Sequence, residues 1–80
     1  MWIPDKCGVY VVKSSDGEAR LEIRQVITKY TGTVVFNDSS GELARTEVVA
    51  DNVPGVVKKT IEWMVLTMKR PAVEFVPLTN

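Results

Sequence analysis

Few side chains in this sequence are of the types that enzymes use for chemistry. The chain has no histidine and a single cysteine, Cys7, so a serine or cysteine nucleophile would lack its usual general base. Cys7 has only Lys6 beside it to stabilise a thiolate. We therefore expect Cys7 to be a small buried apolar residue and the protein not to be an enzyme.

Two groups of oxygen-bearing side chains have the residue types of acid/base or metal sites. Glu22 and Glu47 can share a sheet face, but arginines accompany them on both segments, which is typical of a solvated cross-strand charge lattice. Asp38, Ser40 and Glu42 alternate like calcium ligands, yet their spacing is too short for a calcium-binding loop. We expect no metal and no cofactor.

Size, charge and apolar content define the class of protein. Eighty residues form one domain, because so short a chain cannot build two cores. Ten basic and ten acidic residues cancel, whereas nucleic-acid-binding domains usually carry a basic excess. No apolar run is long enough to span a bilayer, and residues 1–6 do not resemble a secretory signal. With a lone cysteine, these features indicate a cytoplasmic protein.

Four stretches rich in β-branched or alternating residues predict strands. The clearest is 19–28, where Leu21, Ile23 and Ile27 point to one side. Asp16-Gly17 should supply the positive φ of a hairpin turn. The predicted strands are 8–13, 19–28, 33–36 and 43–49, paired as hairpins 8–28 and 32–50 with turns at 14–17, 29–32 and 37–41.

One helix is predicted from Pro54 to Arg70. Asp51 or Asn52 can cap its first turn, where proline is tolerated, and Pro71 should end it. A short last strand, 72–76, lies between prolines and is expected at an edge. The order ββββαβ predicts an α+β domain with a mostly antiparallel sheet of four or five strands and the helix packed on one face.

The predicted helix carries two apolar strips. Its core-facing stripe is expected to comprise Val57, Ile61, Met64, Val65 and Met68. A second strip lies off that face, among basic residues. The sequence permits two interpretations: the strip is covered by residues 2–4 or by a curved sheet, or it binds a partner. The partner-binding residues would be Val56, Lys59, Trp63, Leu66 and Arg70.

Three functional hypotheses follow. The favoured one is a non-enzymatic protein-binding module that inhibits or regulates a larger complex; in size and lack of catalytic chemistry the chain is similar to small phage-encoded inhibitors of host defence systems, including anti-CRISPR proteins. The alternative is a nucleic-acid-binding module using Lys58, Lys59, Lys69 and Arg70, or the charged sheet face of Arg20, Glu22 and Arg24. The third is a homodimer formed through an edge strand or the helix strip.

Overall fold

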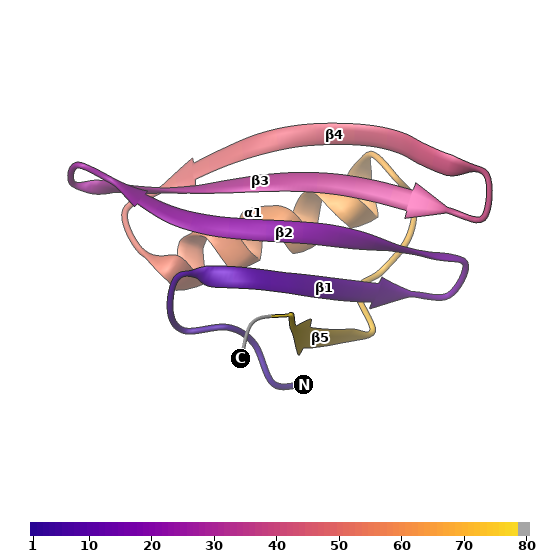
Figure 1. Ribbon diagram of the computed structural model, residues 1–80, viewed down its shortest axis with the longest axis horizontal. Helices are drawn as coiled ribbons and strands as arrows, with labels where there is room; N and C mark the ends of the chain where they lie inside the picture. The colour runs from indigo at the N-terminus through magenta and orange to yellow at the C-terminus, as the bar shows by residue number, and fades with distance from the viewer. Residues whose placement is uncertain (79–80) are drawn as a thin grey trace.

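Alternating apolar and polar residues fold into one five-stranded antiparallel sheet, covered on one face by a single helix (Figure 1). A computed structural model describes residues 1–78. The sheet order is β4-β3-β2-β1-β5. The elements are β1 (Gly8–Ser14), β2 (Gly17–Val26), β3 (Lys29–Asp38), β4 (Gly41–Ala50), α1 (Val53–Leu66) and β5 (Glu74–Pro77). This arrangement confirms the predicted α+β fold and the order ββββαβ.

The first four strands form a continuous meander, because β2 pairs with β3 along its whole length, from Glu18 opposite Asn37 to Val26 opposite Lys29. The turn predicted at 29–32 is wrong. The chain reverses at Ile27 and Thr28 instead, and residues 29–32 belong to β3. Gly32 does not signal a turn here: it lies under the helix, where a side chain would not fit.

Gly17 also has a different role from the one predicted. It does not take a positive φ; it begins β2 in close contact with β3. A Cβ atom at this position would lie 2.6 Å from the Asn37 carbonyl oxygen and 2.8 Å from the Phe36 ring. Glycine is therefore required here by the close approach of two strands, and the Ser15-Asp16 turn tolerates ordinary residues.

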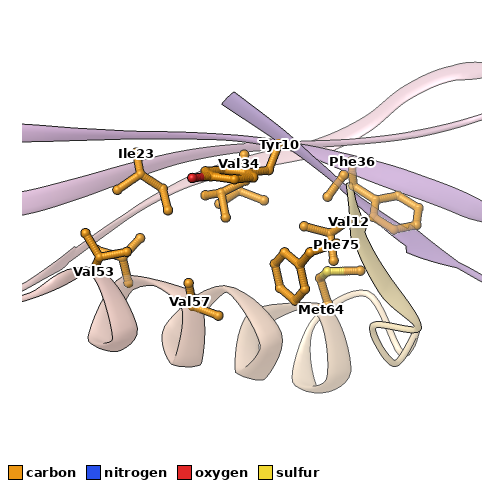
Figure 2. Close-up of a cluster of buried hydrophobic side chains, with 12 residues drawn as sticks. Tyr10, Val12, Ile23, Val34, Phe36, Val53, Val57, Met64 and Phe75 are labelled. Atoms are coloured by element: carbon orange, nitrogen blue, oxygen red, sulfur yellow. The ribbon is translucent and has the colours of Figure 1, made fainter. Parts of the chain in front are cut away.

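The core lies between the inner face of the sheet and α1. Figure 2 shows side chains from the sheet and from the helix pointing toward one another across this space. Burying these apolar side chains is the main force that holds the helix on the sheet. The buried apolar residues are Tyr10, Val12, Ala19, Leu21, Ile23, Val34, Phe36, Val53, Val56, Val57, Met64 and Phe75.

The start of α1 is as predicted, with Asn52 as the cap. Its Oδ1 accepts a hydrogen bond from the Gly55 amide at 2.7 Å, and Pro54 lies in the first turn. The end is four residues earlier than predicted, at Leu66. Lys69 takes a φ of 61°, and the Arg70 amide donates to the Met64 carbonyl oxygen at 2.9 Å. This turn reverses the chain toward β5 before Pro71 is reached.

The helix is also rotated relative to the predicted stripe. Its buried residues are Val53, Val56, Val57, Thr60 and Met64, while Val65 is exposed. Thr60 is accepted in the core because its hydroxyl donates to the Val56 carbonyl oxygen at 2.8 Å. The rotation brings Val56 over Gly32, where β3 has no side chain to oppose it.

β5 is a short edge strand, as predicted, and pairs with β1. It begins at Glu74 rather than at residue 72, and Phe75 faces the core. The N-terminal segment packs near the same end of the sheet: Pro4 is buried, and the Trp2 and Tyr10 ring centroids are 6.1 Å apart. Trp2 therefore lies against Tyr10 of β1.

Cys7 is exposed, so the expectation that it is buried is wrong. The neighbouring Tyr10 is enclosed instead, and its hydroxyl donates to the Lys6 carbonyl oxygen at 2.8 Å. Burial raises the pKa of the Tyr10 phenol, and the nearby Asp5 and Cys7 raise it further. Within residues 1–78, no helix has both the length and the apolar character needed to cross a bilayer.

Candidate functional site

The five residues predicted to form a partner-binding helix strip do not form one exposed surface. Val56 has no exposed area and belongs to the core. The prediction that it binds a partner is therefore wrong. Trp63 is half-buried and packs against the core cluster. Of the strip's three apolar residues, only Leu66 is largely exposed, with 69% of its surface accessible; the charged Lys59 is exposed as well.

The two basic residues of that strip bind within the molecule. Arg70 Nε donates to Asp16 Oδ1 at 2.6 Å, and its guanidinium carbon lies 5.3 Å from the centroid of the Phe36 ring. Arg70 thus ties the segment after α1 to the β1–β2 turn and covers one end of the core. Lys59 Nζ donates to the Val49 carbonyl oxygen at 2.5 Å.

Lys59, Trp63 and Leu66 follow one another at helical spacings of four and three residues, so they line one side of α1. We call this side the helix flank. Since Lys59 reaches Val49 of β4, the helix flank lies on the β4 side of the molecule. The structure therefore brings three of the predicted residues together, beside a strand that the sequence did not connect with them.

The second predicted surface, Arg20, Glu22 and Arg24, lies on the sheet face opposite α1, as the alternate burial of β2 shows. Arg20 is opposite Val11 and Val35, and Glu22 is opposite Val9 and Thr33. Residues directly opposite one another on β2, β3 and β4 form rows across this face, and successive rows alternate in charge. The row through Arg20 extends to Arg45, the row through Glu22 extends to Glu47, and the row through Arg24 is opposite Thr31 and Val49.

This alternation means that no row of one sign adjoins another of the same sign. An extended surface for a phosphate backbone needs clustered cations. The predicted basic residues in and after α1 are divided: Lys59 and Arg70 bond within the molecule, whereas Lys58 and Lys69 are exposed.

Sequence reasoning missed the most exposed apolar residue of the chain, Ile27. It was expected to face the core as part of the alternating run, but it is 87% exposed at the turn between β2 and β3. Val26 beside it is also exposed. We call Val26, Ile27 and Thr28 the hairpin tip; it projects beyond the sheet at one end of the molecule (Figure 1). Two adjacent apolar residues before a turn, breaking the alternation, were the available signal.

Ile27 has a φ of 58°. The first position of a two-residue hairpin turn often requires positive φ, and glycine or asparagine normally occupies it. A β-branched side chain is unfavourable there, because its Cβ and γ carbons crowd the backbone. Gln25 supports the turn by donating from Nε2 to the Ile27 carbonyl oxygen at 3.2 Å. The hairpin tip is thus an exposed apolar element held in a strained conformation.

A shallow depression lies where β4 leads into α1, and its lining includes Lys29, Asp51, Asn52 and Lys59. Lys29 forms an ion pair with Asp51, and this hydrogen-bonded ammonium lowers the pKa of the Asp51 carboxyl. Asp51 directly precedes the Asn52 cap, so a negative charge already lies close to the start of α1. Among residues 1–78, no group of three or more His, Cys, Asp or Glu side chains is placed to hold a metal ion.

Comparison with protein-family models, curated proteins and solved structures finds no match to this chain. Three surfaces of the molecule are therefore the candidates for function: the hairpin tip, the helix flank and the free side of β4.

Proposed function

We propose that this protein is a non-enzymatic protein-binding module of the cytoplasm that inhibits or regulates a larger macromolecular complex. Small phage-encoded inhibitors of host defence systems, such as anti-CRISPR proteins, work in this general way. The single observation that carries the proposal is the hairpin tip, where Ile27 is 87% exposed with a φ of 58°.

The hairpin tip is unfavourable for the isolated molecule in two respects. A residue in a sparsely populated backbone region destabilises the fold by about 1–3 kcal/mol. An exposed isoleucine also gains nothing from burial, which would be worth roughly 1.5–3 kcal/mol for a side chain of this size. Enclosure of Ile27 by a partner would supply this burial energy, which is similar in size to the backbone strain, so the residue is best explained by binding.

The shape and chemistry of the hairpin tip indicate the kind of partner. A projecting turn with Val26 and Ile27 at its end fits an apolar pocket on a larger protein, as an anchor residue does at an interface. The two-residue turn, closed by the pairing of Val26 with Lys29, limits the directions open to the Ile27 side chain before binding, which lowers the entropy lost on association. A protein pocket is therefore a better match than a nucleic acid.

The test compares tagged wild-type protein with two variants as baits in one lysate of the organism that makes it. Ile27→Asn suits the positive φ but removes the apolar anchor, whereas Ile27→Leu keeps an apolar side chain. We expect a protein retained by the wild type and by Ile27→Leu to be lost, at least tenfold, with Ile27→Asn.

Because Ile27 makes no contribution to the core, loss of folding is not expected with either variant, and circular dichroism checks this. If the retained proteins are the same for all three baits, the hairpin tip is not the binding element and the proposal is wrong.

A further inference from the structure

Strand β4 is a long edge strand. It spans ten residues, Gly41–Ala50, and among the described residues only β3 pairs with it. A free strand edge offers unpaired N–H and C=O groups to another chain unless prolines, bulges or charges protect it. The one bulge lies near its start, at the pairing with Phe36 and Asn37, so the rest of the strand is regular. We call the unpaired side of this strand the β4 edge.

The Lys59 bond shows which backbone groups the β4 edge presents. The Val49 carbonyl oxygen accepts from Lys59, so it points away from β3. In an antiparallel strand, alternate residues direct both backbone groups to the same side. Arg45, Glu47 and Val49 therefore present their N–H and C=O groups to the β4 edge. Lys59 uses one lone pair of a single carbonyl oxygen, which has two.

We propose that this protein forms a homodimer in which the β4 edges of two copies pair antiparallel, with a two-fold axis through Thr46. The pairing would join the two sheets into one of twice the width. It goes beyond the proposed function, since it uses a surface separate from the hairpin tip and does not depend on it.

The side chains of β4 are self-complementary in this register. Arg45 lies opposite Glu47 of the second copy, and Glu47 lies opposite the second copy's Arg45. Two equivalent Arg–Glu ion pairs therefore flank the axis, one on each side. Both residues are exposed on the same sheet face. Within residues 1–78, Glu47 makes no ion pair. Arg45 donates to Glu42 of its own strand at 2.7 and 2.8 Å, so in the dimer it would exchange or share this exposed pair with Glu47 of the second copy. Opposite charges directly across two strands stabilise a sheet, and like charges destabilise it.

The apolar residues are matched as well. Val49 at the end of each regular segment comes beside Leu43 of the second copy, the bulge residue that precedes that copy's regular segment; these side chains are 47% and 44% exposed in the single chain. On the inner face, Ala44 falls opposite Val48, a small residue facing a larger one. Dimerisation would cover exposed apolar surface at both ends of the paired segment.

Other symmetric registers are less favourable. Moving the axis by one residue along β4 places either Glu47 opposite Glu47 or Arg45 opposite Arg45. Each arrangement puts like charges at the centre of the interface. The register through Thr46 is the one in which the two central charges are neutralised.

The helix flank adds to the same interface. Lys59, Trp63 and Leu66 lie on the β4 side of α1, so pairing at the β4 edge turns the two helix flanks toward each other. Leu66 is 69% exposed, and Trp63 is half-buried. Side-chain area of this kind supplements the backbone hydrogen bonds, which alone make a small interface.

The experiment measures the mass in solution by light scattering, from low to high micromolar chain concentration, for full-length protein. Reductant is present because Cys7 is exposed and could link chains covalently. We expect the wild type to form a dimer. Arg45→Glu and Glu47→Arg should each raise the dimer dissociation constant at least tenfold, because like charges then face each other.

The decisive sample is an equimolar mixture of these two variants. Arg45→Glu then presents two glutamates to the two arginines of Glu47→Arg, and a heterodimer should form. Arg20→Glu is the matched control: it makes the same charge change away from the β4 edge and should leave the dimer intact. Circular dichroism shows whether each variant is folded.

Two results would overturn the proposal. One is a wild-type protein that remains monomeric at the highest concentration, or single variants that dimerise as the wild type does. The other is a mixture of folded variants that stays monomeric, because the Thr46 register requires the mixed pair to form.

Discussion

Val56 occupies the space in which a side chain on Gly32 would lie. A Cβ atom at Gly32 would be 2.6 Å from Val56 Cγ1 and 3.1 Å from both Leu21 Cδ1 and Val48 Cγ2. The helix therefore approaches β3 more closely than any other residue at position 32 would allow. This contact sets which side of α1 faces the core.

Gly32→Ala is expected to lower the free energy of unfolding by about 1–3 kcal/mol, because an added methyl group overpacks the core. Val56→Ala alone should also destabilise, since it leaves a cavity. In the Val56→Ala background, however, Gly32→Ala should be less damaging than in the wild type. Urea unfolding of the four proteins gives this coupling; strictly additive effects would show that the two residues do not compete for space.

Ile27→Asn is expected to stabilise the isolated protein by about 1 kcal/mol, since asparagine tolerates positive φ better than a β-branched residue does. Ile27→Val retains the branched side chain and serves as the control, with no gain expected. Thermal unfolding of the three proteins measures the difference. A lower melting temperature for Ile27→Asn would show that the turn is not strained by the isoleucine.

Asn52→Ala is expected to destabilise the protein by about 1 kcal/mol, because the Gly55 amide loses its hydrogen-bond acceptor. Asn52→Asp should retain the stability, since a carboxylate accepts the same bond and favours the helix start. Chemical unfolding at neutral pH compares them. Equal losses for both variants would mean that Asn52 does not act as the cap.

Tyr10 is expected to make the protein less stable at alkaline pH. Its folded-state pKa is raised above the unfolded value of about 10. The folded state thus keeps its proton longer than the unfolded state does, and the stability present below pH ~10 is lost as the pH rises through the folded pKa. Tyr10→Phe lacks this effect but also lacks the hydrogen bond to Lys6, worth about 1 kcal/mol.

The measurement is the difference in unfolding free energy between wild type and Tyr10→Phe, followed from neutral to strongly alkaline pH. The lysines titrate in both proteins and cancel in the comparison. The wild-type advantage should shrink above pH ~10. A constant difference across the range would contradict the raised pKa.

Much of the fold was predictable because its signals are local. The alternation of Leu21 and Ile23 gives the strand and its inner face, and Asn52 with Pro54 gives the start of the helix. The position of the first turn was also correct. Its glycine was misinterpreted, because the crowding of Gly17 against Phe36 and Asn37 involves a strand that lies twenty residues further along.

The candidate site was less predictable because it depends on contacts between distant segments. Val56 was assigned to the surface by helix geometry alone, and only the glycine beneath it explains its burial. Likewise, Arg70 was predicted to be available to a partner, because the sequence alone does not show which acidic residue pairs with it. The fold places Asp16, 54 residues earlier, within hydrogen-bond distance of Arg70. The nucleic-acid alternative relied in part on Arg70 and on Lys59, both of which bond within the molecule. Trp63 and Leu66 remain from the predicted strip. They are candidate interface residues because they lie on the β4 side of the helix.

Because β5, the last strand in the sequence, pairs with β1, the first, β1 cannot complete its pairing until the end of the chain is made. Strands β1 to β4 and the helix each contact a sequence neighbour, so they can form as the chain emerges from the ribosome. β1, although synthesised first, keeps one side unpaired until residues 74–77 become available. During synthesis the oldest strand is therefore the last to be completed, and until then its free side, like the β4 edge, is open to pairing with another nascent chain.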